Sequence, residues 1–262
     1  AISALSTIDT AIWDIVGKTA NLPLHRLFGA CRTKIKTYAS GGLWLSQSID
    51  SLLKNTQNFL DQGFRSMKIR VGSTNWKNDV ERVKEVRNAI GPDIELMADI
   101  NQALEPKQAI QLGKKLEEYD LLWLEEPVAS NNREGHAEVR SALATPIASG
   151  ENEYSLSGMR EMIEAKACDI LMPDLQRIGG ISEMRKVANL AESHNLPIST
   201  HIFTEHSLSV AGSVTNCLSV EHMPWFSKLF NEQIYVINGY IDIPERPGTG
   251  FTFNESYIKL IN

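Results

Sequence analysis

The chain has 262 residues, of which 42% are hydrophobic and 22% are charged, and its formal net charge is −6. A chain of this length can bury a large core, and α/β barrels commonly take about 200 to 250 residues as one domain. Its basic residues are scattered among the acidic ones rather than gathered into runs, which argues against nucleic acid or a membrane surface as a partner.

The cysteines are too few and too unevenly spaced for a disulfide framework or a paired-cysteine metal site; they are Cys31, Cys168 and Cys217. No run of about 18 apolar residues predicts a membrane span, and no basic segment followed by an apolar run marks a signal peptide. We therefore expect a cytoplasmic protein. The chain begins at Ala1 directly in a helical pattern, so we also expect an upstream portion.

The first predicted element is an amphipathic helix whose apolar residues recur at helical spacing: Leu5, Ile8, Ile12 and Ile15. Turn-forming residues between Gly17 and Pro23 end it. From residue 35 onward, short β-rich runs alternate with helical patterns. We predict strands near residues 35–39, 66–71, 94–99, 121–125, 146–150, 169–173, 197–201 and 218–221. Eight strands alternating with helices predict an α/β fold, a (β/α) barrel of the TIM type.

The alternation of strand and helix patterns ends after Glu221. Turn signals such as Asn238-Gly239 and Pro247-Gly248 surround short β-like runs, so we expect this tail to leave the barrel and pack elsewhere. The sequence thus divides into a helical segment over residues 1–30, a barrel catalytic domain over 31–222 and a C-terminal tail over 223–262.

A polar or ionisable residue stands at the carboxyl end of nearly every predicted strand. These residues are Lys68, Asp99, Glu125, Glu151, Asp174, His201 and Glu221. In a parallel barrel the carboxyl ends of all strands converge on one mouth, where active sites lie. We therefore expect side chains that are far apart in the sequence to share one pocket.

Three of these residues are carboxylates that follow consecutive strands: Asp99, Glu125 and Glu151. Grouped at a pocket floor they would repel one another unless a cation neutralised them, and hard oxygen ligands favour Mg²⁺. Any one of them alone could equally be a solvated loop acid. Their placement on three consecutive strand ends favours the metal site.

Asp174 and His201 follow the sixth and seventh strands. A carboxylate there can bond one imidazole nitrogen, fix the tautomer and leave the other nitrogen facing a substrate. A lone histidine after a strand is more often structural than catalytic. We keep that structural interpretation for His194, His206 and His222.

These motifs together resemble the enolase superfamily and its mandelate racemase group. The resemblance is carried by Lys68-Ile69-Arg70, Asp99-Ile100-Asn101-Gln102, Trp123-Leu124-Glu125-Glu126-Pro127, Gly150-Glu151-Asn152, Met172-Pro173-Asp174, Ile178-Gly179-Gly180 and Ser199-Thr200-His201. It extends over essentially the whole chain, from Ala11-Ile12-Trp13-Asp14 to Pro247-Gly248-Thr249-Gly250.

The resemblance implies a role for each strand-end residue. Asp99, Glu125 and Glu151 would bind Mg²⁺, and Asp174 with His201 would form the base that removes the proton beside a substrate carboxylate. Lys68 and Glu221 would donate to the enediolate that results, and we expect the pKa of Glu221 to be raised. Asn101 and Glu126 would support these groups, with Asn101 near the substrate.

One position departs from the family's pattern. Many relatives carry Lys-x-Lys on the second strand, the second Lys acting as a base opposite the histidine, and this chain has Arg70 there. Because a guanidinium stays protonated, it is a poor base and a good carboxylate ligand. Racemisation needs a base on each face of the carbon, whereas β-elimination needs one, so we predict a sugar-acid dehydratase. This argument requires that Lys68 does not turn inward as a second base.

Three other functions stay open. A racemase or epimerase would use the same enediolate, and a non-catalytic relative would bind a ligand or serve in an assembly. A cycloisomerase is disfavoured by His201 and Arg70, because that branch relies on lysines from both sides of the barrel. The resemblance also implies an α+β capping domain upstream, linked by residues 1–30 and met by the tail, and a homo-oligomer acting on a small carboxylic acid.

Overall fold

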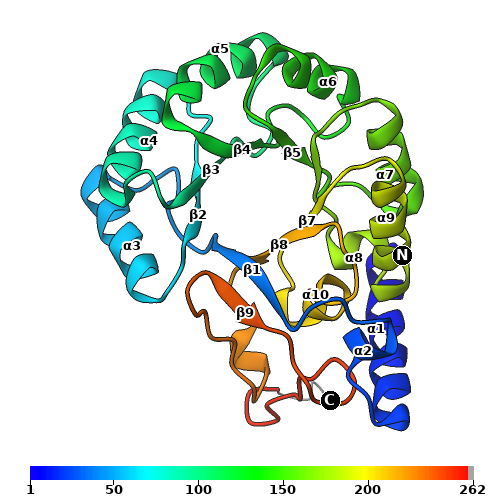
Figure 1. The fold of residues 1–262 in the computed structure, drawn as a ribbon. Helices are drawn as coiled ribbons and strands as arrows, with labels where there is room; N and C mark the ends of the chain where they lie inside the picture. The colour runs from blue at the N-terminus through cyan, green and yellow to red at the C-terminus, as the bar shows by residue number, and fades with distance from the viewer. Residues whose placement is uncertain (259–262) are drawn as a thin grey trace.

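The computed structural model describes residues 1–258, which form a closed barrel of eight parallel strands surrounded by helices (Figure 1). The strands follow the order β2-β3-β4-β5-β6-β7-β8-β1, and pairing between β1 and β2 closes the circle. Their bounds are β1 (Lys34–Ala39), β2 (Ser66–Arg70), β3 (Glu95–Asp99), β4 (Leu121–Glu125), β5 (Ile147–Ser149), β6 (Ile170–Leu171), β7 (Ile198–Thr200) and β8 (Cys217–His222). The predicted barrel is confirmed, and each predicted strand overlaps an observed one.

Helices alternate with these strands on the outside of the barrel. They are α1 (Ile2–Ala20), α2 (Leu24–Leu27), α3 (Ile49–Asp61), α4 (Trp76–Ile90), α5 (Pro106–Leu116), α6 (Arg133–Ala142), α7 (Ser155–Glu164), α8 (Leu175–Ile178), α9 (Ile181–Ser193) and α10 (Thr204–Ala211), with 3₁₀ turns η1 (Glu117–Tyr119) and η2 (Ser227–Leu229). Local signals start several of them: Ser48 accepts a hydrogen bond from the Ser51 amide at α3, and a capping box opens α5. Within residues 1–258 no helix is both long and apolar enough to cross a membrane.

The barrel interior has an apolar layer beneath a charged one. The apolar layer contains Tyr38, Met97, Trp123, Ala148, Ile170 and Met172. Tyr38 and Trp123 meet edge to face with their ring centroids 5.4 Å apart. Side chains two residues apart on a strand point to the same face, so Asp99 lies above Met97 and Glu125 above Trp123. The apolar layer therefore forms the floor beneath the charged residues at the mouth of the barrel.

Helix α1 forms where it was predicted but presents its apolar stripe to the outside. The exposed fractions of Leu5, Ile8, Ile12 and Ile15 are 56%, 58%, 54% and 62%. Its buried residues are instead small, namely Ser6, Thr10 and Gly17. Small side chains let the helix approach its neighbours closely, as where the Ser6 hydroxyl donates to the carbonyl of Leu175 at 3.0 Å. Periodicity identified the helix but not which of its faces packs on the barrel.

The C-terminal tail stays against the barrel, which differs from the expectation that it leaves. Strand β9 (Tyr240–Asp242) pairs antiparallel with the start of β1. Further on, the Gly248 region bridges to Pro23, and the amide of Thr249 donates to Asp14 Oδ1 of α1 at 2.9 Å. The turn signals were correctly placed, but the backbone of β1 gives the short run after Gly239 a strand to pair with.

Because α1 lies close to the tail, we expect an alanine in place of a glycine of α1 to destabilise the protein, although alanine favours a helix. A Cβ at Gly17 would lie 2.7 Å from the Cα of Gly248. Alanine favours a helix by up to about 1 kcal/mol over glycine, but a backbone clash in a packed contact typically costs about 1–3 kcal/mol. We expect Gly17→Ala to lower the free energy of unfolding, measured by urea denaturation.

The matched control for this effect is Gly158→Ala in α7. There the added Cβ meets the end of the Glu153 side chain, at 2.6 Å from Oε2, rather than backbone. Because a side chain can shift, this substitution should cost less than Gly17→Ala. An equal or smaller effect at Gly17 would show that the contact between α1 and Gly248 is loose.

Candidate functional site at the barrel mouth

The strands bring the predicted carboxylates together at the mouth. Asp99 and Glu125 end neighbouring strands β3 and β4 and are paired in register. Glu151 follows β5, and Glu221 lies in β8. All four are buried, with Glu125 and Glu221 fully so. Burying several like charges side by side is costly unless cations lie among them.

Lys68 supplies one such cation. Its side chain turns inward, and Nζ lies 2.5 Å from Glu125 Oε1, 3.0 Å from Glu221 Oε1 and 3.4 Å from Asp99 Oδ2. Burial alone would lower the pKa of Lys68, but Glu125 and Glu221 outweigh it and hold this pKa well above its usual range. The ammonium therefore stays protonated, and Lys68 cannot serve as a second base although it points inward.

The pKa values of Glu125 and Glu221 are shifted in opposite directions. Burial, with the charges of Asp99 and Glu221, raises the pKa of Glu125 to about 8 despite the opposing effect of Lys68. Burial would raise the pKa of Glu221 too, but the charges of Lys68 and His201 lower it below its usual range. The expectation of a raised pKa for Glu221 is thus wrong, because two cations and the Ile202 amide, which donates to Oε2 at 2.9 Å, favour its ionised form.

Asp174 and His201 meet as predicted. His201 Nδ1 lies 2.7 Å from Asp174 Oδ2, and the other carboxylate oxygen accepts the Arg177 amide at 2.8 Å at the start of α8. The other imidazole nitrogen, Nε2, faces the mouth, 3.2 Å from Glu151 Oε2. Burial would lower the pKa of His201, but the Asp174 bond and the charges of Glu151 and Glu221 raise it to about 9.

The backbone after His201 is strained. Ile202 has φ 29° and Phe203 φ 47°, which is unusual for a β-branched and an aromatic residue. The same turn points the Ile202 amide at Glu221 and lets Thr204 donate to the Glu221 carbonyl. Strain of this kind persists where surrounding contacts fix it, often at functional sites.

The remaining predicted residues lie around these groups. Arg70 ends β2, with Nε 3.4 Å from Asp99 Oδ2. Asn101 orients Asp99, because its amide donates to Oδ1 at 2.8 Å and its side-chain nitrogen to Oδ2 at 3.1 Å. Glu126 accepts from Asn152 at 2.7 Å, so it supports the loop that carries Glu151.

Two residues at the mouth were missed in the sequence analysis. Arg177 donates from Nη1 to the carbonyl of Glu151 at 2.9 Å and lies 3.3 Å from its Oε1. Trp44 lies against the Arg70 guanidinium, whose Cζ is 5.0 Å from the ring centroid. The position of Arg177, three residues after Asp174 on a helical turn, could have indicated the first; only the fold brings the second to Arg70.

The histidines kept as structural do not join this group. Burial lowers the pKa of His206 and His222 to about 4, so both are neutral at neutral pH. His222 stacks on Phe64, and His206 packs near Phe230. His194 is exposed at the end of α9.

The donor set at the mouth fits a divalent cation. Among residues 1–258 no three acidic or histidine side chains are arranged as a metal cluster, and the Lys68 ammonium lies between Asp99 and Glu125. Asp99, Glu125 and Glu151 nevertheless present hard oxygen ligands from three neighbouring strands, the type that Mg²⁺ prefers. Burial is the main cause of the raised pKa of Glu125, with the charges of Asp99 and Glu221 adding to it, and a bound cation would offset both effects.

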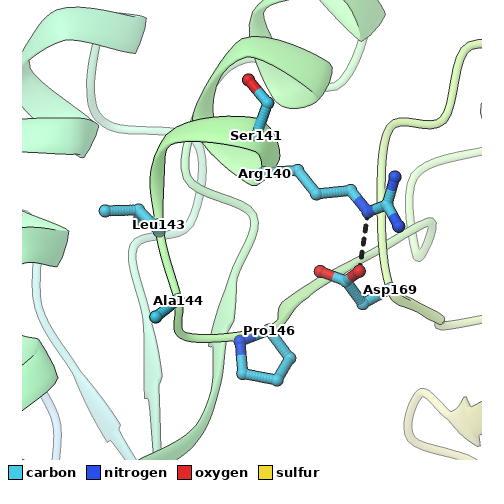
Figure 2. A pocket seen from close by; sticks show the side chains of 6 residues that line it. All are labelled: Arg140, Ser141, Leu143, Ala144, Pro146 and Asp169. Carbon is cyan, nitrogen blue, oxygen red and sulfur yellow. Dashed lines mark hydrogen bonds and ion pairs between the residues drawn. The ribbon is translucent and has the colours of Figure 1, made fainter.

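A separate cavity of about 390 Å³ lies toward the end of the barrel opposite the mouth (Figure 2). It is lined by residues that precede β5 and β6, such as Pro146 and Asp169, so it faces the amino ends of the strands. Figure 2 shows Arg140 turned toward Asp169, and Nε lies 2.7 Å from Oδ1. This ion pair ties α6 to the amino end of β6, whereas active sites in such barrels lie at the carboxyl ends of the strands.

Fold and site together define a (β/α) barrel with an acid–base pair and a carboxylate cluster at its carboxyl mouth. The family model described as enolase C-terminal domain-like matches residues 51–257, and that of the mandelate racemase / muconate lactonizing enzyme N-terminal domain matches residues 1–29. The chain belongs to the mandelate racemase / muconate lactonizing enzyme family of the enolase superfamily.

Named relatives include enzymes of two reaction types. L-talarate/galactarate dehydratase of Salmonella typhimurium is 38% identical over 97% of this chain and 64% of its own length. The crystal structure of an L-talarate/galactarate dehydratase mutant liganded with Mg and L-glucarate has a TM-score of 0.95 at 37% identity, covering 97% of this chain and 65% of that one. A racemase from Streptomyces coelicolor with bound magnesium has a TM-score of 0.94 at 32% identity, covering 97% and 71%.

The Asp174–His201 contact predicts a shift in titration. Since the pKa of His201, about 9, lies above the ordinary 6.5, its stabilising effect is complete below about pH 6.5 and is lost as pH rises through 9. Asp174→Asn should lower this pKa toward 6.5, as followed by NMR of the imidazole in chelator-treated protein. Asp169→Asn, at the opposite face, is the control. An unchanged His201 titration in Asp174→Asn would contradict the contact.

Proposed function

We propose that this chain is the barrel of a Mg²⁺-dependent enzyme that removes the proton beside the carboxylate of a sugar acid and then eliminates water. The observation that carries the proposal is the Asp174–His201 pair at 2.7 Å, with Nε2 turned toward the buried carboxylates of the mouth. The relatives named above support a sugar acid as the substrate.

Asp99, Glu125 and Glu151 would hold the cation. Bound Mg²⁺ would polarise the substrate carboxylate and offset the negative field that raises the pKa of His201. Lys68 would donate to the same carboxylate, and ionised Glu221, with Oε1 3.0 Å from the ammonium, would hold Lys68 in place. A fixed cation aimed at a carboxylate favours the enediolate, which carries more negative charge there than the substrate does.

His201 would then perform both proton transfers. With Nδ1 held by Asp174, neutral Nε2 takes the proton from the carbon beside the carboxylate, and the C–H electron pair moves into the enediolate. The same proton passes from Nε2 to the hydroxyl on the next carbon, the C–O bond breaks, and water leaves. The enol that remains tautomerises to a 2-keto-3-deoxy acid.

Arg70 and Lys68 favour elimination over racemisation. Racemisation requires a second base on the opposite face of the carbon. Lys68 is held protonated by its carboxylate partners, and Arg70 carries a guanidinium that does not deprotonate in proteins. His201 is therefore the one base that we place at the mouth, and one base suffices for elimination.

The direct test is a screen of aldonic and aldaric acids with Mg²⁺, using the full-length protein and detecting the 2-keto-3-deoxy product. We expect turnover with at least one acid and its loss on chelation. His201→Asn should lower kcat by roughly 10²–10⁴-fold, the usual contribution of a general base. His194→Asn, an exposed histidine, should not lower it. Equal activity in both variants would remove His201 from the mechanism and favour a non-catalytic role.

A second variant tests the one-base argument. Arg70→Lys places at this position an amine, which unlike a guanidinium can lose its proton once Lys68 and a bound Mg²⁺ offset the charge of nearby Asp99. We expect the variant in deuterated water to return some substrate of inverted configuration carrying deuterium, followed by NMR, while the parent enzyme returns none. Inverted, labelled substrate from the parent enzyme would overturn the dehydratase assignment in favour of a racemase.

A further inference from the structure

The carboxylate of Glu125 lies directly above the apolar floor of the barrel mouth. Glu125 ends β4, and Trp123 stands two residues earlier on the same face of that strand. The indole Nε1 of Trp123 donates to Glu125 Oε2 at 3.0 Å, and both side chains are fully buried. The floor is therefore not purely apolar, because it presents one N–H group to the charged layer above it.

This indole is one of two donors to the Glu125 carboxylate among residues 1–258. The other is the Lys68 ammonium, whose Nζ lies 2.5 Å from Oε1. The two donors differ in charge. The ammonium would be repelled by a divalent cation at the mouth, whereas the indole is neutral. Trp123 is therefore the donor that can stay with Glu125 when a cation binds, and it restricts the rotation of the carboxylate.

The other two proposed metal ligands are oriented by residues outside the floor. Asn101 follows β3 and donates twice to Asp99. Arg177 of α8 lies with Nη1 3.3 Å from Glu151 Oε1. Glu125 is instead supported from inside the barrel by the indole. Partners that hydrogen-bond to metal-ligating side chains typically contribute about 10–100-fold to metal affinity.

The indole is itself held by Tyr38 of β1. The two rings meet edge to face, with their centroids 5.4 Å apart. The Tyr38 ring also lies beneath the Lys68 ammonium, with Nζ 5.5 Å from its centroid, which is within the range of cation–π attraction. In the part of the chain that the structure describes, the buried Tyr38 hydroxyl has no hydrogen-bond partner. The ring of Tyr38, rather than its hydroxyl, is thus the part that contacts the neighbouring groups.

We propose that Trp123 is a positioning residue for the metal site: its indole N–H orients Glu125 as a ligand, and the Tyr38 ring holds the indole in place. This inference rests on the metal site of the proposed function and adds to it two residues that lie below the charged layer. A cavity of about 110 Å³ lies beside both rings, toward the amino ends of the strands, so the variants that test the proposal should keep bulky side chains there.

The test measures the affinity of the full-length protein for Mg²⁺ alone by titration calorimetry. Trp123→Phe keeps a ring but removes the N–H donor, and we expect it to raise the Kd for Mg²⁺ by about 10–100-fold. Tyr38→Leu removes the ring against the indole and should raise the Kd less, by about two- to tenfold.

Two matched variants serve as controls. Tyr38→Phe loses only the hydroxyl that has no partner among the described residues, so it should keep the Kd of the parent protein. Met97→Leu changes the packing of the same apolar layer without removing a polar contact and should also keep it. Thermal unfolding of each variant identifies those that do not fold.

An unchanged Kd for Mg²⁺ in Trp123→Phe would overturn the proposal. An equal rise in Trp123→Phe and Met97→Leu would overturn it too, because it would give Trp123 a packing role only. If the parent protein binds Mg²⁺ with this dependence on Trp123 but dehydrates no acid, the proposed reaction fails and the inference stands. If the parent protein binds no Mg²⁺, both fail.

A measurement on the parent protein decides the matter where Trp123→Phe does not fold. The indole N–H resonance of Trp123, assigned through its contact with the Tyr38 ring, is followed by NMR as Mg²⁺ is added. We expect it to shift as the site fills, whereas the resonance of Trp13, whose indole donates to Ser182 outside the barrel, should not move. An unmoved Trp123 resonance at saturating Mg²⁺ contradicts the proposal.

Discussion

The structure of the barrel mouth depends on how buried carboxylates are kept together. Asp99, Glu125 and Glu151 follow three neighbouring strands, and Glu221 lies in β8; they converge because the parallel sheet closes. Burying these like charges together is costly unless a counter-charge lies among them. The ammonium of Lys68, within 3.4 Å of three of these side chains, is the counter-charge supplied by the chain itself.

The grouping of buried carboxylates around Lys68 also determines which neighbouring residues can give or accept a proton. Because Lys68 stays protonated, it binds negative charge and cannot accept a proton. Because Glu221 faces both Lys68 and His201, it stays ionised, so it stabilises cations rather than donating a proton. The carboxylate field also raises the pKa of His201. A divalent cation bound beside this histidine would offset that field and favour the neutral imidazole that can accept a proton.

The sequence predicted the features that depend on strand direction and alternation. Polar residues at strand ends must meet at the mouth of a parallel barrel, and this places Asp99, Glu125, Asp174 and His201 together without knowledge of any distance. Features that depend on tertiary contact were not predictable. The stripe from Leu5 to Ile15 has helical period, but its orientation depends on the small residues that α1 packs against the barrel.

The pKa shifts were predicted least well from the sequence, because they too depend on tertiary contacts. A pKa depends on all charges within several ångströms, and the sequence does not give the direction in which Lys68 points. Once Lys68 turns inward, the expected shift of Glu221 reverses its sign. The contact between Trp44 and Arg70 is of the same kind, since it joins a loop after β1 to the end of β2.

Arg70 brings a guanidinium, rather than an amine, to the mouth of the barrel. A lysine at this position could exchange protons, but its single nitrogen could not bond Asp99, Ser40 and a ligand in a fixed plane. The guanidinium gives up proton exchange and gains directional donors. With Trp44 against one face, its orientation no longer depends on the substrate. The guanidinium at this position therefore holds its donors in place and does not exchange protons.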